Sequence, residues 1–245
     1  EGTRTGLLAL RHLLDHSGRP SPPPVREPAR TSRRLPAGGP ELFGLLREYG
    51  IPAVRTEAAA SRDAALAAAG AIGYPVVIKT DEPGIAHKSD VGGVRLGLAG
   101  PAEAGAAYDD LAARLGPRVV VCETAPPGTE LALGIVTDPA LGPLLVVGAG
   151  GVLVEILAER AVLLAPVTRS AALAALRRLR IAPVLAGSRG QPAADLDAIA
   201  DAITGLSRLA CDLGDTLEAL DINPLICAPA GPVAVDALLI PRTPA

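Results

Sequence analysis

The chain has 245 residues, of which 49% are hydrophobic and 20% are charged. This composition is sufficient for a substantial core and is too apolar for a disordered chain. The formal net charge of −3, with three tyrosines, one phenylalanine and no tryptophan, argues against a nucleic-acid-binding protein. Such a protein needs positive charge for the phosphates or aromatic surfaces for the bases.

The longest apolar run, residues 143–154, is too short and too rich in glycine to span a bilayer, so no membrane association is expected. No export signal opens the chain, and its three cysteines are widely spaced in apolar surroundings. We therefore expect three reduced thiols and a cytoplasmic protein. Because the chain begins with Glu1 and contains no methionine, we also expect it to be a piece of a longer polypeptide.

Residues 1–40 differ from the rest, because a segment with helical spacing precedes a linker rich in proline and arginine. From residue 41 onward, segments with helical and strand-like spacing alternate. The predicted helices cover 41–49, 61–71, 102–115, 170–178 and 195–213. The predicted strands cover 53–55, 75–79, 93–98, 118–123, 130–137, 144–147, 152–156, 217–222, 225–228 and 233–236. This mixture predicts an α/β or α+β globule.

The first candidate for chemistry is a loop that joins two predicted strands. The first strand ends at Lys79, and the loop then offers His87 and Lys88. Gly92 and Gly93 return the chain to the second strand. Glycine lets backbone amides approach a phosphate and lysine supplies a point charge, so the two lysines and two glycines are candidate nucleotide-binding residues. The histidine is a candidate nucleophile toward phosphorus; the alternative is a solvated histidine in an ordinary loop.

The second candidate lies near the end of the chain, where Asp221, Asn223 and Asp236 fall at the ends of short predicted strands. Magnesium prefers hard oxygen ligands and keeps several waters, so one amide oxygen and one or two carboxylates are a sufficient protein contribution. These three residues are therefore candidate metal ligands. The alternative is that Asn223 and Pro224 merely turn the chain and that the aspartates cap loops.

The third candidate is a pair of acids, Glu123 and Glu130, that flank a Pro-Pro-Gly turn between two predicted strands. Carboxylates at such a crossover can accept hydrogen bonds from the hydroxyl groups of a ribose. They are equally compatible with solvated turn residues.

A glycine-rich turn, Gly148–Gly151, has some features of a dinucleotide-binding loop. It lacks the third glycine of that fingerprint, and the apolar residues after it read as a strand and not as a helix. We therefore reject an NAD-binding function for this turn.

Several segments, taken together and in this order, resemble the ATP-grasp half of the ADP-forming acyl-CoA synthetases, which are relatives of the β subunit of succinyl-CoA synthetase. The resemblance covers about residues 41–240. The segments are GYPVVIK (73–79), IAHKSDVGGVRLGL (85–98), PPGTELALGI (126–135), DPALGPLLVVGAGGVLVEIL (138–157), SRGQPAADLD (188–197) and LDINPL (220–225). HKSDVGGV in combination with LDINPL is highly specific.

The resemblance implies an ATP-grasp fold in which two lobes clamp a nucleotide. The smaller lobe is expected at about 57–133, and the larger at about 41–56 and 134–245.

The resemblance also implies roles for single residues. Lys79 corresponds to the lysine on the nucleotide phosphates, and Glu123 and Glu130 to the acids around the ribose and adenine. Asn223 and Asp236 correspond to the ligands of Mg²⁺.

The implied activity is reversible: acyl-CoA + ADP + phosphate gives acid + ATP + CoA. It requires a CoA-binding half, or α half, fused upstream or present as a separate chain. His87 corresponds to the second phosphorylated histidine, which carries the phosphoryl group to ADP.

Three positions depart from the pattern of this family. Ala219 replaces the acid of ELDINPL, and Glu159 and Leu163 replace an aspartate and an arginine after the glycine-rich turn. The missing arginine affects either the contact with the partner half or catalysis. Chains that are similar to this family also occur as regulatory parts of protein acetyltransferases, so the alternative function is a catalytically weak or inactive synthetase-like regulatory module of such an enzyme.

Overall fold

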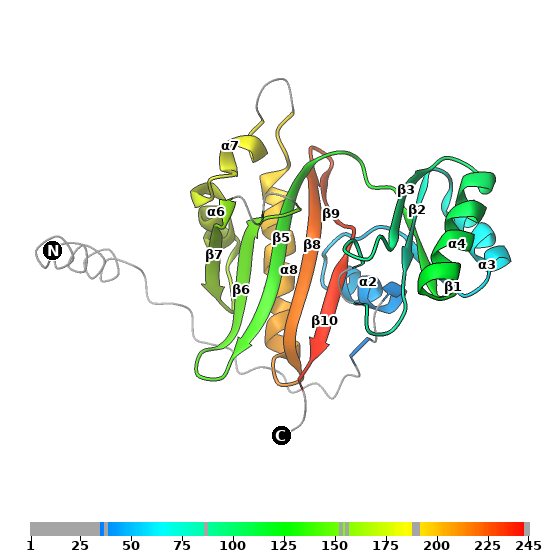
Figure 1. Cartoon of the computed structure of the whole chain (residues 1–245). Helices are drawn as coiled ribbons and strands as arrows, with labels where there is room; N and C mark the ends of the chain where they lie inside the picture. The colour runs from blue at the N-terminus through cyan, green and yellow to red at the C-terminus, as the bar shows by residue number, and fades with distance from the viewer. Residues whose placement is uncertain are drawn as a thin grey trace, which may run out of the picture.

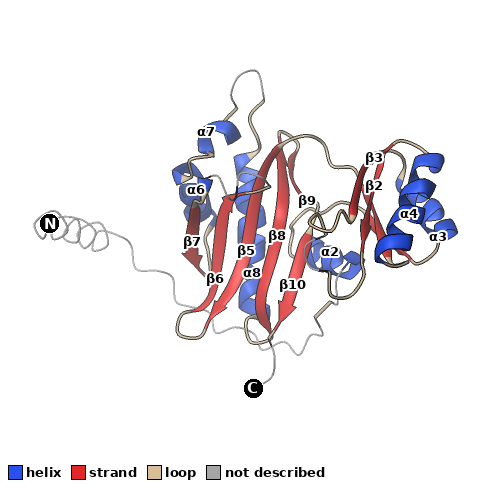
Figure 2. Cartoon of the chain, viewed as in Figure 1, coloured by secondary structure: helices blue, strands red, loops and turns tan. Residues whose placement is uncertain are grey.

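The structure is a computed structural model that describes residues 35–36, 39–85, 88–151, 154, 157–187 and 192–242. The described residues form two β-sheets with antiparallel strand pairing, and each sheet is covered by its own helices (Figure 1). Figure 2 shows the same arrangement coloured by type, with the long helix α8 (Leu196–Leu213) behind the strands of the larger sheet. The two sheets define a smaller and a larger lobe.

The smaller lobe contains a four-stranded sheet in the order β1-β4-β2-β3. Its strands are β1 (Thr56–Ala59), β2 (Val76–Thr80), β3 (Val94–Leu98) and β4 (Val119–Glu123). Helices α3 (Arg62–Ile72) and α4 (Pro101–Leu115) pack on one face of this sheet. There, Ile78 and Val121 of the sheet share a core with Leu111 of α4.

The larger lobe contains a six-stranded sheet in the order β10-β8-β5-β6-β7, with β9 paired to β8. Its strands are β5 (Thr129–Asp138), β6 (Gly142–Ala149), β7 (Arg160–Leu164), β8 (Leu217–Ala228), β9 (Gly231–Ala234) and β10 (Ala237–Pro241). Its helices are α2 (Gly39–Glu48), α6 (Arg169–Arg178), α7 (Ala182–Leu185) and α8 (Leu196–Leu213). The central helix α8 buries a long apolar stripe in the core of this lobe.

Two helices begin at the residues that the sequence predicts. The Ser61 hydroxyl accepts a hydrogen bond from the backbone N–H of Ala64 at the start of α3, and Gly73 caps the other end. The Asp195 carboxylate likewise accepts a hydrogen bond from the N–H of Ala198 at the start of α8. Each cap satisfies a backbone donor that the helix itself leaves unpaired.

The two lobes meet through a small apolar cluster. Val77 of β2 and Val120 of β4 are buried on the face of the smaller sheet that does not carry α3 and α4. Val233 and Val235 of the larger lobe pack against them. This contact brings the segment that joins β9 to β10 close to the end of β2. Lys79 lies at that end of β2.

The predicted strand at 152–156 is wrong where the structure describes it. Val154 and Leu157 are helical, and the N–H of Val154 donates to the Gly151 carbonyl. Gly151 has a φ of +55°, a left-handed conformation that turns the chain out of β6. The strand β7 then follows, which the sequence analysis did not predict.

Other predicted strands change their limits. The segment 53–55 forms only an isolated bridge at Ala53, and the strand begins at Thr56. The two predicted strands 217–222 and 225–228 are one continuous strand, β8. The last predicted strand, 233–236, overlaps only the end of β9, and Asp236 lies between β9 and β10, a strand that was not predicted.

The strand β5 lies entirely in the larger sheet, where it pairs with both β6 and β8. The expected lobe boundary at residue 133 would divide this strand. Because β4 ends at Glu123 and β5 pairs with strands of the larger sheet from Thr129 onward, the chain crosses between the two sheets at 124–128.

The cysteines are free thiols, of which Cys122 and Cys227 are buried and Cys211 is partly exposed. Within the described ranges, none of the helices combines the length and the apolar character that a bilayer crossing requires.

Candidate active site

Charged residues of both lobes converge where the end of β2 meets the segment between β9 and β10. The Lys79 side chain is only 9% exposed, and its ammonium donates a hydrogen bond to the Val235 carbonyl over 2.6 Å. The Asp236 carboxylate lies 3.9 Å from the Lys79 ammonium and 3.3 Å from that of Lys88. A buried ammonium group needs such partners, because its desolvation is otherwise uncompensated. The structure thus brings these three predicted site residues together.

Asn223 of β8 adjoins this group through its backbone. Its backbone N–H donates to the Asp236 carbonyl over 3.2 Å, so the two proposed metal ligands are tied together through the backbone. Its amide oxygen accepts a hydrogen bond from the N–H of Gly151 over 3.2 Å. We call the group formed by Lys79, Lys88, Gly151, Asn223 and Asp236, together with Glu130, the junction site.

Glu130 belongs to the junction site because it touches the glycine-rich turn. It is the second residue of β5, and its carboxylate occupies the space beside Gly151, where an added Cβ atom would lie 1.6 Å from Oε2. The carbonyl of Glu130 accepts a hydrogen bond from the N–H of Gly150 over 2.9 Å. The Glu130 carboxylate and the Asn223 amide oxygen therefore both adjoin Gly151.

Glu123 and Asp221 take other positions. Glu123 ends β4, and its Oε2 accepts a hydrogen bond from the backbone N–H of Arg55 over 3.2 Å and lies 3.6 Å from the guanidinium Nε. Asp221 lies nearer the start of β8, where it pairs with Gly134 on one side and Leu238 on the other. Asp221 therefore precedes Asn223 on the same strand.

The two glycines of the loop shape its return to β3. The N–H of Gly93 donates to the Lys88 carbonyl over 2.7 Å, and an added Cβ atom at Gly93 would lie 2.6 Å from the Thr80 side chain. Gly92 has a φ of +60°, and its carbonyl accepts a hydrogen bond from Arg114 over 2.9 Å. The N–H of Gly93 is therefore engaged within the loop, and the glycines serve the close turn that brings Lys88 to Asp236.

His87 lies outside the described residues. Its neighbour in the sequence, Lys88, is described and forms the ion pair with Asp236.

Asp81 directly follows β2, and its carboxyl group is partly buried. Burial raises the pKa of this carboxyl group above its ordinary value. The positive charges of Lys88 and Arg118 act in the opposite direction and lower it.

The donor set of the junction site fits a magnesium ion. The described residues contain no group of three or more His, Cys, Asp or Glu side chains that could hold a metal without other ligands. The Asn223 amide oxygen and the Asp236 carboxylate supply two hard oxygen donors. This is the contribution expected for Mg²⁺, which takes its other ligands from waters and nucleotide phosphates.

Sequence reasoning missed Gly151 as part of this site. The turn that contains it was considered only as a dinucleotide-binding loop. The available signal was the pair of consecutive glycines at the end of an apolar strand, which indicates a close approach of the backbone to another group.

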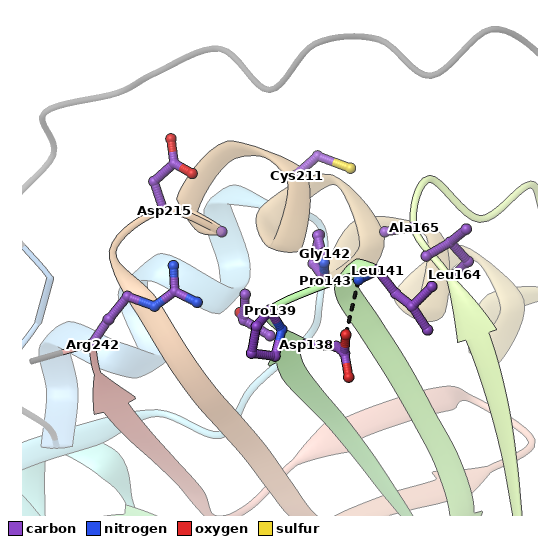
Figure 3. A pocket seen from close by; sticks show the side chains of 12 residues that line it. Asp138, Pro139, Leu141, Gly142, Pro143, Leu164, Ala165, Cys211, Asp215 and Arg242 are labelled. Carbon is purple, nitrogen blue, oxygen red and sulfur yellow. Dashed lines mark hydrogen bonds between the residues drawn. The ribbon is translucent and has the colours of Figure 1, made fainter.

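A separate pocket of about 360 Å³ lies at the opposite end of β5 from Glu130. Figure 3 shows the side chains of Asp138, Cys211, Asp215 and Arg242 around it. The Asp138 carboxylate accepts a hydrogen bond from the N–H of Leu141. None of the site residues predicted from the sequence lines this pocket.

Comparisons with known proteins agree with the fold. Residues 29–240 match the family described as the ATP-grasp domain. The chain is 36% identical over 224 residues to the β subunit of acetate–CoA ligase [ADP-forming] I of Pyrococcus furiosus, a match that covers 88% of this chain and 96% of that protein.

Among solved structures, the chain is similar to the Ca. Korarchaeum cryptofilum dinucleotide forming acetyl-coenzyme A synthetase 1. In complex with coenzyme A, Ca-AMPCP and HgCl+, that protein gives a TM-score of 0.79 at 33% identity, covering 84% of this chain and 93% of the other. In complex with coenzyme A and Mg-AMPPCP, with a phosphohistidine segment pointing towards the nucleotide-binding site, it gives a TM-score of 0.73 at 34% identity, covering 83% and 90%. The expected ATP-grasp fold is confirmed, and the chain belongs to the ATP-grasp domain family, among the β subunits of ADP-forming acetate–CoA ligases.

Proposed function

We propose that this chain is the nucleotide-binding half of an ADP-forming acyl-CoA synthetase, which with a CoA-binding half converts acyl-CoA, ADP and phosphate into acid, ATP and CoA. The observation that carries this proposal is the convergence of Lys79, Lys88, Asn223 and Asp236 between the two lobes. The similarity to ligases along nearly the whole chain supports it over a regulatory module of an acetyltransferase.

The lysines of the junction site are suited to bind nucleotide phosphates. Lys79 is held at the end of a buried strand, so its ammonium is a fixed point charge. Lys88 lies in a loop and can turn from Asp236 toward a phosphate oxygen. Asn223 and Asp236 would hold Mg²⁺, which when bound neutralises charge on the phosphates.

The two acids would bind the nucleoside. We propose that Glu130 and Glu123 accept hydrogen bonds from the ribose and adenine. Glu123 has one carboxylate oxygen engaged by the backbone N–H of Arg55, which fixes its orientation.

We propose His87 as the residue that carries the phosphoryl group. An imidazole nitrogen with a free lone pair attacks the phosphorus, and a P–N bond forms as the bond to the donor breaks. In the second step, an oxygen of the β-phosphate of ADP attacks the phosphorus, the P–N bond breaks and ATP forms. The Korarchaeum relative contains a phosphohistidine segment that points towards its nucleotide-binding site, which supports this assignment.

The test uses the chain together with its CoA-binding half. The His87→Ala variant should lose ATP formation from acyl-CoA, ADP and phosphate, while Mg-ADP affinity by calorimetry changes little. A His12→Ala variant is the matched control, because residue 12 lies outside the part that matches the family. Full synthetase activity in His87→Ala would disprove the carrier role. Absence of Mg-ADP binding in the wild type would disprove the nucleotide-binding function.

A further inference from the structure

Gly151 is the point where three elements of the larger lobe meet. It follows β6, its N–H donates to the Asn223 amide oxygen on β8, and it borders the Glu130 carboxylate on β5. The space that a side chain at this position would occupy is filled by that carboxylate, 1.6 Å from the place of a Cβ atom.

The neighbouring glycine fixes the position of this turn. The N–H of Gly150 donates to the Glu130 carbonyl, and an added Cβ atom at Gly150 would lie 2.6 Å from the backbone of Leu131. The turn therefore lies against β5 through backbone contacts that only glycine permits. At Gly151, in contrast, the obstructing atoms belong to the end of a flexible side chain. A side chain at 151 would thus displace the Glu130 carboxylate before it displaced the turn.

We propose that Gly151 is a positioning residue for the metal and the nucleotide, an inference that rests on the proposed function. Its N–H orients the Asn223 amide so that the oxygen, which retains a second lone pair, faces the metal position. Because Gly151 has no side chain, the Glu130 carboxylate can occupy the space beside it. Hydrogen bonds to a metal ligand fix its orientation, and their loss typically costs about 10- to 100-fold in metal affinity.

The direct test is a Gly151→Ala variant, with Gly142→Ala as the matched control. Gly142 also has a positive φ, +79°, but has no atom within 4 Å of an added Cβ. Both variants therefore share the backbone strain, and only Gly151→Ala disturbs Glu130. Calorimetry should show ADP affinity reduced about tenfold in Gly151→Ala, because the displaced Glu130 carboxylate loses its hydrogen bonds to the nucleoside. The reduction should appear both with Mg²⁺ and in EDTA, and Gly142→Ala should match the wild type.

Two further measurements keep the test decisive if Gly151→Ala folds poorly. In the Asn223→Ala variant, amide hydrogen exchange of Gly151 measured by NMR should become faster, because the acceptor of its N–H is removed. In Gly151→Ala combined with Glu130→Ala, the added methyl group should cost no further Mg-ADP affinity beyond the loss in Glu130→Ala alone.

Equal Mg-ADP affinity of Gly151→Ala and Gly142→Ala, or an unchanged exchange rate at Gly151, would overturn the positioning role while leaving the proposed function intact. If the wild type showed no Mg-dependent ADP binding, the proposed function and this role would both be wrong.

Discussion

The Lys88 ammonium in the smaller lobe lies 3.3 Å from the Asp236 carboxylate in the larger lobe. Lys79 approaches the same carboxylate oxygen to 3.9 Å, so one anion is shared by two cations. In the proposed function a metal would attract this carboxylate, and nucleotide phosphates would attract the two lysines. Because these partners compete, we expect removal of Asp236 to change ADP affinity in opposite directions with and without the metal.

The Asp236→Ala variant should bind ADP more weakly with magnesium and more tightly without it. With Mg²⁺, a ligand is lost and the affinity should fall by about tenfold or more. In EDTA, removal of the carboxylate frees both lysines for the phosphates, and affinity should rise by a few-fold, about 0.5–1 kcal/mol. Calorimetry under both conditions checks this, with Asp201→Ala on α8 as the control. A change of the same sign in both conditions would contradict the prediction.

The Lys88→Met variant should bind a divalent metal more tightly in the absence of nucleotide. Removing the ammonium removes a competitor for Asp236, and an ion pair of this kind contributes at most about 1 kcal/mol, which corresponds to roughly fivefold. Titration with Mn²⁺ followed by electron paramagnetic resonance measures this affinity. The control is Arg169→Met, which removes an exposed ion pair with Asp201 on α8. Weaker or unchanged Mn²⁺ binding in Lys88→Met would show that the two cations do not compete.

Local sequence patterns predicted most of the helices and strands. Ser61 and Asp195 are the first residues of two predicted helices, and the structure has them as the caps directly before α3 and α8. The end of β6 was not predicted, because the turn there depends on contacts between distant segments. Gly148 lies against the Glu159 carbonyl, and Gly150 lies against β5. An apolar run with glycines carries no local sign of such contacts.

In the candidate site, too, some residues could be predicted from the sequence and others depend on contacts between distant segments. The residue types and the resemblance singled out Lys79, Lys88, Asn223 and Asp236, and the structure brings these side chains or their backbones into contact. The role of Gly151 could not be predicted, because it consists of a backbone N–H and an absent side chain. Both properties depend on the approach of β5 and β8 to the turn.

The Asp81→Asn variant should be more stable than the wild type at neutral pH. Burial raises the pKa of this carboxyl group above the unfolded value of 3.8, so ionisation costs the folded state more than the unfolded state. The wild type therefore loses stability as pH rises from 3.8 through the folded pKa, and the loss persists at higher pH. Because Asp81 is only partly buried, the gain in the variant should be below about 1 kcal/mol.

Thermal unfolding as a function of pH checks this prediction. The difference between Asp81→Asn and the wild type should shrink toward zero as the pH falls below 3.8. Asp90→Asn, a change at an exposed position in the following loop, is the control. A variant that was less stable than the wild type at neutral pH would show that the net effect of Lys88 and Arg118 exceeds that of burial.

Alkylation of the native protein should modify Cys211 first. Its side chain is partly exposed at the pocket of Figure 3, whereas Cys122 and Cys227 are buried. Burial raises the pKa of the Cys227 thiol to about 12 and also raises that of Cys122, so few of these groups form the reactive thiolate near neutral pH. Burial and Asp212 also raise the pKa of Cys211, so its reaction should be slow and should accelerate as pH increases.

Mass spectrometry after iodoacetamide treatment at several pH values measures this order. The wild type should gain one modification, and Cys211→Ser should gain none until the protein is unfolded in denaturant, when Cys122 and Cys227 become accessible. Cys211→Ser also tests independence from the junction site, because the pocket lies at the opposite end of β5, and Mg-ADP affinity should be unchanged. Rapid native modification of Cys227 would mean that the core between β8 and α8 opens readily, since a buried thiol with a pKa of about 12 does not react in the closed protein.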